Sequence, residues 1–246
     1  MKTNLLSAAL IFLSLSLPAQ DKKGEVLVED AKIKAWKQAE AAEYQSLYHF
    51  SNSELESTLL LVVDNDSCYA QIQSGEWGKK EGKDIWVWKF ENLRNVRIEG
   101  NKFFSDKTDG EFVTFDHENR QLKGLMVYKP WSSWLFYANS RGHELGATCG
   151  TVTTHFPGRF PYASWRQLNK AELEKMTQSD RQIMKNEIFA RYGYIFKPQG
   201  EMDRYFRKQS WYQPQKPQVN DYLTGLEKLN IELIQTIDKN PWQPTK

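Results

Sequence analysis

The chain has 246 residues, of which 33 are Lys or Arg and 31 are Asp or Glu, so its net charge is +2 with His neutral. This balance lacks the basic excess of a nucleic-acid-binding surface, and we expect no nucleic-acid partner. Nine Trp, eleven Tyr and thirteen Phe form a heavy aromatic load. The alternation around several of them assigns most to the core of a sheet and leaves some to line a ligand surface.

The first twenty residues have the three parts of a cleavable secretory signal. Lys2 is the positive start, residues 5–17 are apolar, and residues 18–20 precede the charged run 21–23. The apolar part is shorter than the roughly 20 residues of a membrane-spanning helix. We therefore predict cleavage near Gln20 and export to the periplasm or the extracellular space, with no membrane span after cleavage.

The two cysteines, Cys68 and Cys149, belong to a chain predicted for an oxidising compartment, where paired thiols persist as disulfides. We predict one bridge between them. It would close a loop of about 80 residues and contribute about 4 kcal/mol to the free energy of unfolding in the loop-entropy description. The alternative is a catalytic thiol at Cys149, with His143 or His155 as its base.

The first mature segment, residues 28–44, has a helix-forming composition. Ala31, Ala35, Ala39 and Ala42 recur around Trp36, and this spacing predicts one amphipathic helix. We expect that helix to pack against a sheet.

From Leu59 to Phe136 the apolar runs are short, β-branched or aromatic, and alternate with polar residues. Trp86, Trp88 and Phe90 share one face of a predicted strand. Two further pairs of runs predict antiparallel hairpins: residues 96–98 with 102–104, and residues 112–115 with 125–128. A small open barrel or a single twisted sheet accommodates this pattern.

Residues 137–164 contain six Gly or Pro residues and are predicted to be irregular, with one strand at residues 151–155. We place a domain boundary near their end. The predicted organisation is α+β: an antiparallel β-rich domain with one helix, then a small all-α module. The divisions are a signal at 1–20, the β-rich domain at 21–164, the helical module at 165–240 and a tail at 241–246.

Beyond the boundary, residues 168–192 regain helical spacing, and Gly193 follows as a C-terminal cap. A second helix is predicted at about residues 222–237, with Leu226, Leu229, Leu233 and Ile237 on one apolar face. We expect the first helix to cover that face.

The segment 186–196, with the sequence Asn-Glu-Ile-Phe-Ala-Arg-Tyr-Gly-Tyr-Ile-Phe, resembles the YARHG domain, a small module of exported bacterial proteins. Later landmarks follow in the same order: residues 205–206, residues 210–212, and a helix at 223–234 that carries Glu227, Asn230 and Ile231. The resemblance covers about residues 166–238. It implies an extracytoplasmic location and a binding or structural role, and it implies no reaction.

The chain departs from the motif at its first position, where Tyr is Phe189, and at its fourth, where His is Tyr192. A Tyr does not titrate near neutral pH, so histidine acid-base or metal chemistry is not expected here. As candidate binding residues the resemblance suggests Asn186, Arg191, Tyr192, Tyr194, Trp211 and Tyr212. The alternative is structural: Arg191 would bond carbonyls near the end of the helix, and Trp211 and Tyr212 would close a small core.

Other motifs lack the spacing of the ligand sites that they resemble. The Gly-rich segment 75–83 lacks the four-residue gap and the Ser or Thr of a phosphate-binding loop, and we interpret it as a turn between two strands. The acids of 105–111 lack the spacing of a calcium loop and are typical of a hairpin turn. Asp64 and Asp66 are turn formers. The four histidines have no metal-ligand spacing, and we expect no metal and no cofactor.

Two functions from different classes remain open. The first is a non-enzymatic envelope protein that binds or orders an envelope component or an extracellular polymer. Residues 165–246 contain 14 basic and 10 acidic residues, which permits a weak preference for anionic polymers. The second is a hydrolase of such polymers, with Glu54, His143, His155 and Cys149 in the β-rich domain as its reactive groups.

Overall fold

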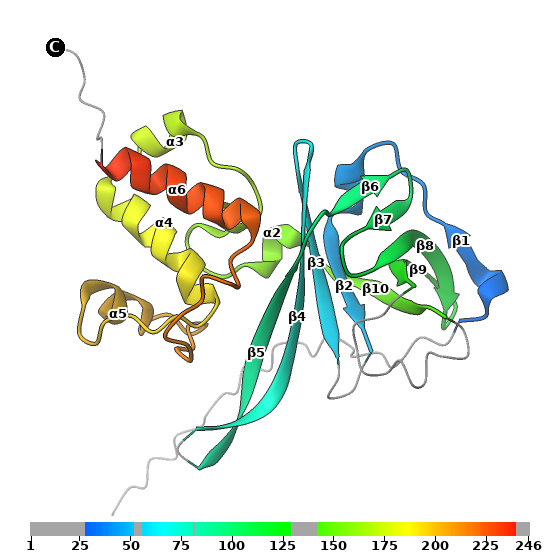
Figure 1. Ribbon diagram of the computed structural model, residues 1–246, viewed down its shortest axis with the longest axis horizontal. Coiled ribbons are helices and arrows are strands. Elements are labelled where there is room, and N and C mark those ends of the chain that lie inside the picture. The colour runs from blue at the N-terminus through cyan, green and yellow to red at the C-terminus, as the bar shows by residue number, and fades with distance from the viewer. Residues whose placement is uncertain (1–27, 52–55, 81, 129–141, 240–246) are drawn as a thin grey trace, which may run out of the picture.

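The computed structural model describes residues 28–51, 56–80, 82–128 and 142–239. Within them an antiparallel sheet is curled into a half-barrel, and a helical domain follows it and lies against one of its faces (Figure 1). The predicted α+β class, with the β-rich part first, is confirmed.

The described part of the sheet has ten strands. They are β1 (Ile33–Ala35), β2 (Ser46–Phe50), β3 (Ser57–Asp64), β4 (Ser67–Lys80), β5 (Lys83–Leu93), β6 (Arg97–Glu99), β7 (Lys102–Phe104), β8 (Asp109–His117), β9 (Arg120–Val127) and β10 (Glu144–Gly150). Their order is β5-β4-β3-β2-β10-β9-β8-β7-β6, and β1 pairs with β8 outside this path. The two hairpins predicted over 96–104 and 112–128 are present as β6–β7 and β8–β9.

Strand β3 explains how the two parts of the chain are joined. Leu59 and Leu61 point into the half-barrel, where they meet Tyr48, Phe50 and other core residues. Leu60 and Val62 point the other way, into a cluster that includes Leu226 of the helical domain. Because the strand is covered on both faces, its sequence is a continuous apolar run rather than an alternating one.

The hairpin of β4 and β5 is the longest feature of the sheet. Its register runs from Ala70 opposite Leu93 to Lys80 opposite Lys83, and its outer half projects beyond the rest of the sheet (Figure 1). Gly82 has φ +78° in the turn, a conformation that favours glycine. The turn predicted over 75–83 is therefore too long, because residues 75–80 belong to β4 and Lys83 begins β5.

The helix predicted over residues 28–44 is wrong. This segment contains a 3-10 turn at Asp30–Lys32, strand β1 and a second 3-10 turn at Ala41–Tyr44. Its intrinsic helix propensity is overridden by pairing with β8 and by packing of Trp36, whose amide nitrogen donates to Phe112 O at 2.9 Å. The Tyr44 ring stacks on Phe112 at 4.0 Å.

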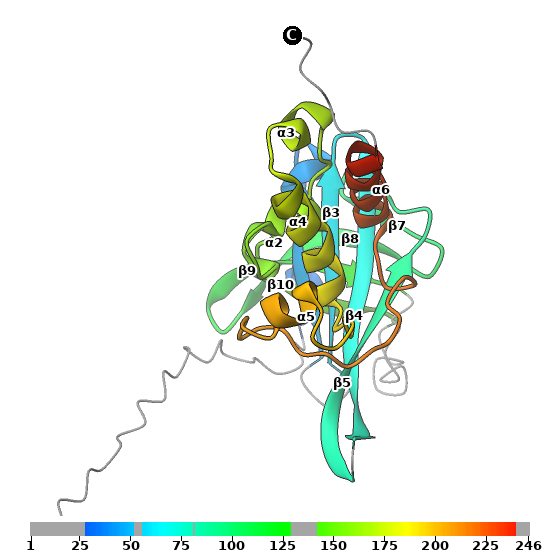
Figure 2. The ribbon, with the colours of Figure 1, turned by 90° about the vertical axis from the view of Figure 1, so that its left-hand side faces the viewer.

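The helical domain contains a short helix at the junction, two long helices and two short ones. These are α2 (Val152–His155), α3 (Lys170–Glu174), α4 (Gln178–Arg191), α5 (Glu201–Phe206) and α6 (Gly225–Lys239). Figure 2 shows α4 and α6 in front of strands β3 and β4, on one face of the sheet. Among the described residues no helix is long and apolar enough to cross a membrane.

Three details of the helix predictions need correction. The strand expected at residues 151–155 is the single-turn helix α2. The helix expected over 168–192 is divided, because the side chains of Asn169 and Thr177 each cap a new helix. On α6 the buried face contains Ile231 and Ile234, whereas Leu229 is 47% exposed. The predicted cap holds: Gly193 follows α4 with φ +75°.

Candidate functional site

The six predicted binding residues fall into two places in the fold. Arg191 and Tyr192 end α4 at the junction with the sheet, whereas Tyr194, Trp211 and Tyr212 surround α5. Asn186 lies on α4, where its Nδ2 donates to Gln182 O at 2.8 Å. The sequence motif therefore does not form one compact set of contacts.

Arg191 is buried and all of its described contacts are within the chain. Its Nε donates to Pro157 O at 2.9 Å, and its Nη2 donates to Phe160 O at 3.0 Å. Nη1 donates to Ser164 Oγ at 2.8 Å. Arg191 was predicted to bond carbonyls near the end of its own helix. It does bond carbonyls, but they belong to the loop before α3 and not to the end of α4.

Glu187, one turn earlier on α4, is the charge partner of Arg191. The two side chains are 1% and 5% exposed and lie 3.1 Å apart. The same carboxylate accepts hydrogen bonds from the amide nitrogens of Arg159 at 2.6 Å and Phe160 at 2.7 Å. A Cβ atom on Gly158 would lie 2.7 Å from this carboxylate, so only glycine fits beneath it. The ion pair therefore holds the loop 157–160 against α4.

Tyr192 and Glu227 form the centre of the junction. Tyr192 Oη donates to Glu227 Oε2 at 2.7 Å, and Ser164 Oγ donates to Glu227 Oε1 at 2.6 Å. The Thr224 amide nitrogen donates to Oε2 at 3.0 Å. Glu227 is fully buried. Its carboxyl oxygens are thus surrounded by donors from three separate segments.

Gln71 connects the sheet to the same set of contacts. It is a fully buried polar residue of β4. Its Nε2 donates to Tyr222 O at 2.6 Å and lies 3.3 Å from Tyr192 Oη. We call the six residues Gln71, Ser164, Glu187, Arg191, Tyr192 and Glu227 the junction network.

Burial sets the protonation of the junction network. Desolvation raises the pKa of Glu227, and hydrogen bonds from Ser164 and Tyr192 oppose that rise. Desolvation also raises the pKa of Tyr192 well above its usual value, with a further rise from the nearby Glu227 charge. Tyr192 therefore stays a hydrogen-bond donor throughout the physiological range.

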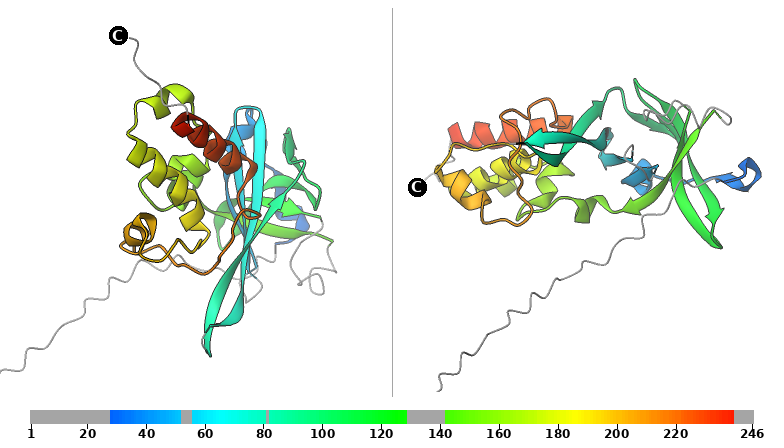
Figure 3. Two further views of the ribbon diagram at one scale, coloured as in Figure 1. Left: turned by 60° about the vertical axis from the view of Figure 1, so that its left-hand side comes forward. Right: turned by 90° about the horizontal axis from the view of Figure 1, so that it is seen from below.

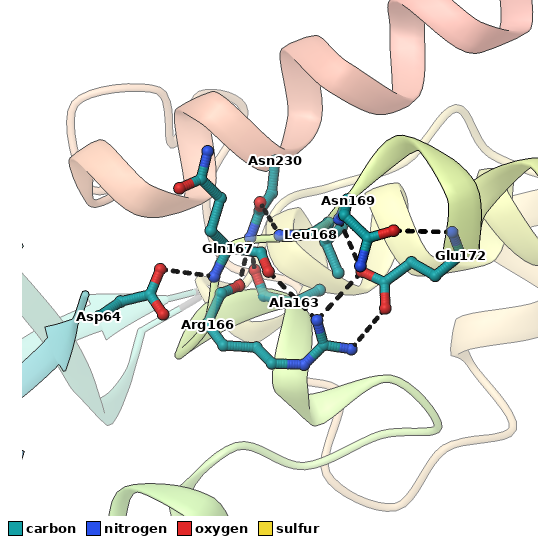
Figure 4. Close-up of polar contacts among 8 residues, drawn as sticks. All are labelled: Asp64, Ala163, Arg166, Gln167, Leu168, Asn169, Glu172 and Asn230. Atoms are coloured by element: carbon teal, nitrogen blue, oxygen red, sulfur yellow. Dashed lines mark hydrogen bonds and ion pairs between the residues drawn. The ribbon is translucent and has the colours of Figure 1, made fainter.

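A second set of contacts joins the sheet to the start of the helical domain (Figure 4). The Asp64 carboxylate, at the turn after β3, accepts a hydrogen bond from the Gln167 amide nitrogen at 2.9 Å. Asn230 of α6 accepts from Leu168 N and donates to Ala163 O and Arg166 O, each at 2.9 Å. Asp64 is therefore a domain contact as well as a turn former.

The residues around α5 form a small aromatic core, as the structural alternative predicted. Phe196 stacks on Phe206 at 5.0 Å, and Tyr212 lies beside both. Tyr212 Oη donates to Tyr194 O at 2.6 Å. Trp211 packs against Phe206 but remains half-buried, so one part of its ring is open to solvent.

The predicted disulfide is not formed in this structure. Cys68 lies on β4 and Cys149 on β10, and each carries a thiol. Strands β2 and β3 lie between them, which corresponds to three strand spacings or about 14 Å. The Cα atoms of a disulfide lie within about 7 Å of each other, so this sheet order keeps the two residues apart.

Among the described residues, two of the groups considered for hydrolysis have pKa shifts that do not suit a nucleophile and its base. Desolvation raises the pKa of Cys149 to about 11, the wrong direction for a thiolate nucleophile. Burial and the Arg191 charge lower the pKa of His155 to about 4, and its ring contacts Gln73 Nε2 at 3.2 Å. His143 lies 3.7 Å from Asp30, and Glu54 lies outside the described residues. Within the described ranges, no three His, Cys, Asp or Glu side chains could hold a metal ion.

A surface that the sequence assigned mainly to core lies on the β4–β5 hairpin. Trp77 and Trp88 are 60% and 45% exposed. Both pack edge-on against Trp86, at 5.3 and 6.2 Å between ring centres. We call Trp77, Trp86 and Trp88 the tryptophan face. Alternation had placed Trp86 and Trp88 on one side of a strand, but it could not show that the strand extends past its neighbours.

Comparison with known families gives one match. Residues 159–239 match the YARHG domain, which confirms the resemblance drawn from the motif and extends it by a few residues toward the N-terminus. The match includes Ser164, Glu187, Arg191, Tyr192 and Glu227. No family matches the N-terminal part, and neither the curated proteins nor the solved structures gave a match.

Proposed function

We propose that this protein, which carries a YARHG domain on a half-barrel sheet, is an exported, non-catalytic protein that binds a component of the cell envelope. The YARHG domain would provide structure, and the ligand would contact exposed side chains elsewhere. The secretory signal predicted at residues 1–20 supports export, as does the match of residues 159–239 to a domain of exported proteins.

One observation carries the structural role of the motif: its Arg191 and Tyr192 are buried and bonded to partners within the chain. A ligand would have to displace Ser164, Glu187 or Glu227 to reach them, and that would leave buried charges unpaired. The motif is therefore suited to hold the domain on the sheet and unsuited to contact a ligand.

Binding is preferred to hydrolysis because Cys149 and His155, two of the candidate reactive groups, have the wrong protonation properties. A thiol whose pKa is about 11 is almost wholly protonated at neutral pH, and a histidine whose pKa is about 4 is a weak base. Trp211 is retained as a candidate contact residue since part of its ring is open to solvent.

The proposal is tested by expressing the full chain in a bacterial host and recovering the protein from each compartment. We expect a periplasmic or extracellular product whose mass corresponds to a chain starting near Asp21. That product should co-sediment with washed envelope material and release no soluble fragments from it. A full-length cytoplasmic product, or envelope polymer cleaved by the protein, would contradict the proposal.

A further inference from the structure

The tryptophan face is held rigidly before any ligand arrives. The ring of Trp86 lies over Gly75, where a Cβ atom would come within 2.3 Å of it. Trp77 and Trp88 each pack edge-on against this ring. Because the three rings fix one another, little side-chain entropy is lost when a ligand packs on them.

The tryptophan face is continuous with the contact between the sheet and the YARHG domain. Gln73 and Phe90 pair on the same face of the hairpin, two residues along from Gly75 and Trp88. Phe90 packs on Tyr192 and Tyr222 of the YARHG domain. Further out, Gln215 Nε2 donates to Trp86 O at 3.4 Å. A ligand on the tryptophan rings would therefore reach the edge of the YARHG domain.

The contact through Gln215 also argues against a peptide strand as the ligand. Strand β5 ends the sheet order, and such an edge is a common site of strand addition. Here the carbonyl of Trp86 is already taken by Gln215. A strand added at this part of the edge would have to displace Gln215, whereas the side-chain rings are exposed.

The charge around the tryptophan face is positive. We call residues 197–216, which include α5 and Trp211, the α5 lobe; it has five basic and two acidic residues. The hairpin segment 75–89 has four basic and three acidic residues. Together they carry +4, whereas the whole chain carries +2. Figures 1 and 2 show α5 at about the mid-height of the molecule and the outer half of the hairpin below it, and Gln215 of the α5 lobe contacts the hairpin at Trp86.

Arg207 of the α5 lobe pairs with the buried Asp203, whereas two ion pairs of the hairpin are exposed contacts that a ligand can exchange. Lys89 lies 2.5 Å from Glu76, and Lys79 lies 3.4 Å from Asp84. All four side chains are more than half exposed. Ion pairs of this kind contribute little to stability, so their cations remain able to meet an external carboxylate.

We propose that the tryptophan face and the α5 lobe together bind an acidic polysaccharide, an inference that rests on the proposed binding function and gives its ligand class. Indole rings would pack against the apolar C–H faces of the sugars. Lys and Arg side chains would meet the carboxylates along the polymer. The α5 lobe contacts the hairpin through Gln215 and Trp86, so the exposed rings and the basic residues of the lobe together suit a polymer that is both ring-bearing and anionic.

The test measures binding of the full mature chain to alginate, a carboxylated sugar polymer, by isothermal titration calorimetry at low salt. Dextran supplies sugar without charge, polyglutamate supplies charge without sugar, and oligothymidylate supplies charge with stacking bases. We expect alginate to bind at least tenfold more tightly than each of the three. The Trp77→Ala/Trp88→Ala variant should weaken alginate binding at least tenfold.

Leu229→Ala is the matched control, since Leu229 is an exposed apolar side chain on α6, outside the proposed surface. It should bind alginate like the unchanged protein. Equal binding of polyglutamate or dextran, tighter binding of oligothymidylate, or full alginate binding by the double Trp variant would each overturn this inference. The protein could still co-sediment with envelope material, so the proposed function would survive that result.

Discussion

Tyr192 donates its hydroxyl hydrogen to Glu227 at 2.7 Å, at a point where the half-barrel sheet and the YARHG domain meet. The two residues lie 35 positions apart in the sequence. Both residues are buried from solvent. The hydrogen bond therefore stabilises the contact between the two parts of the chain. Its removal should lower the free energy of unfolding.

Tyr192→Phe removes that donor and leaves the ring in place. Because Glu227 is fully buried, the loss of this hydrogen bond to its carboxyl group should lower the free energy of unfolding by about 1–3 kcal/mol, although Thr224 still donates to the same oxygen. Urea unfolding followed by circular dichroism measures the change. Tyr128→Phe is the control, since the Tyr128 hydroxyl bonds Glu111 in an exposed contact and its loss should change stability by less than about 1 kcal/mol. Equal effects of the two substitutions would contradict a special role for Tyr192.

Arg191→Ala breaks the buried ion pair with Glu187 and the bonds to Pro157, Phe160 and Ser164. We expect a loss of about 3–5 kcal/mol, because a buried carboxylate would lose its charge partner. The exposed pair of Lys89 and Glu76 gives the matched comparison, and Lys89→Ala should cost less than about 1 kcal/mol. Urea midpoints measure both. A small effect at Arg191 would mean that water or another donor replaces the guanidinium.

Acidification should destabilise the protein through His155. Its pKa is about 4 in the folded protein and 6.5 without the fold, so the unfolded chain binds a proton that the folded chain excludes between these values. The free energy of unfolding should fall as pH decreases from about 7 to 4, by up to about 3 kcal/mol from this group. Burial of Glu227 acts in the opposite direction, since its raised pKa favours the folded state at lower pH.

The contribution of His155 is isolated by comparing pH profiles of the unchanged protein and His155→Gln. The variant lacks the titrating ring and retains every carboxylate, so the difference between the two profiles should grow below pH 6.5. Parallel profiles would show that His155 titrates equally in the folded and unfolded chains.

The two cysteines should both be titratable as thiols. Their separation by two strands predicts that iodoacetamide, applied to unreduced protein in denaturant, adds two carbamidomethyl groups per chain by mass spectrometry. In the native protein at pH 7, alkylation of Cys149 should be slow because its pKa is about 11. A product with no added group in denaturant would restore the disulfide predicted from the sequence.

Much of the fold could be predicted from local patterns. The hairpins β6–β7 and β8–β9 follow from alternation and turn residues within a few positions of one another. The segment 28–44 could not be predicted this way, because its Ala-rich composition favours a helix and only the distant strand β8 makes it a strand. The face of α6 was misjudged since Leu229 is exposed and polar residues take buried positions.

The site was harder to predict than the fold because the residues of the junction network come from four separate segments. Gln71 in a buried strand, and Glu227 and Asn230 on the apolar side of an amphipathic helix, were signals of a buried polar network. Taken singly they have no assigned partners. Only the assembled chain shows that Gln71, Tyr192 and Glu227 meet, and that the motif of the YARHG domain faces inward.

We propose that the motif holds the domain in place while exposed rings meet the ligand. The decisive experiment compares two variants, Tyr192→Phe and Trp77→Ala/Trp88→Ala, at one temperature at which both are folded. It measures the fraction of each protein that is retained on washed envelope material. We predict that Tyr192→Phe is retained like the unchanged protein and that the double Trp variant is largely lost. Loss of the folded Tyr192→Phe variant, with the Trp variant retained, would contradict the claim.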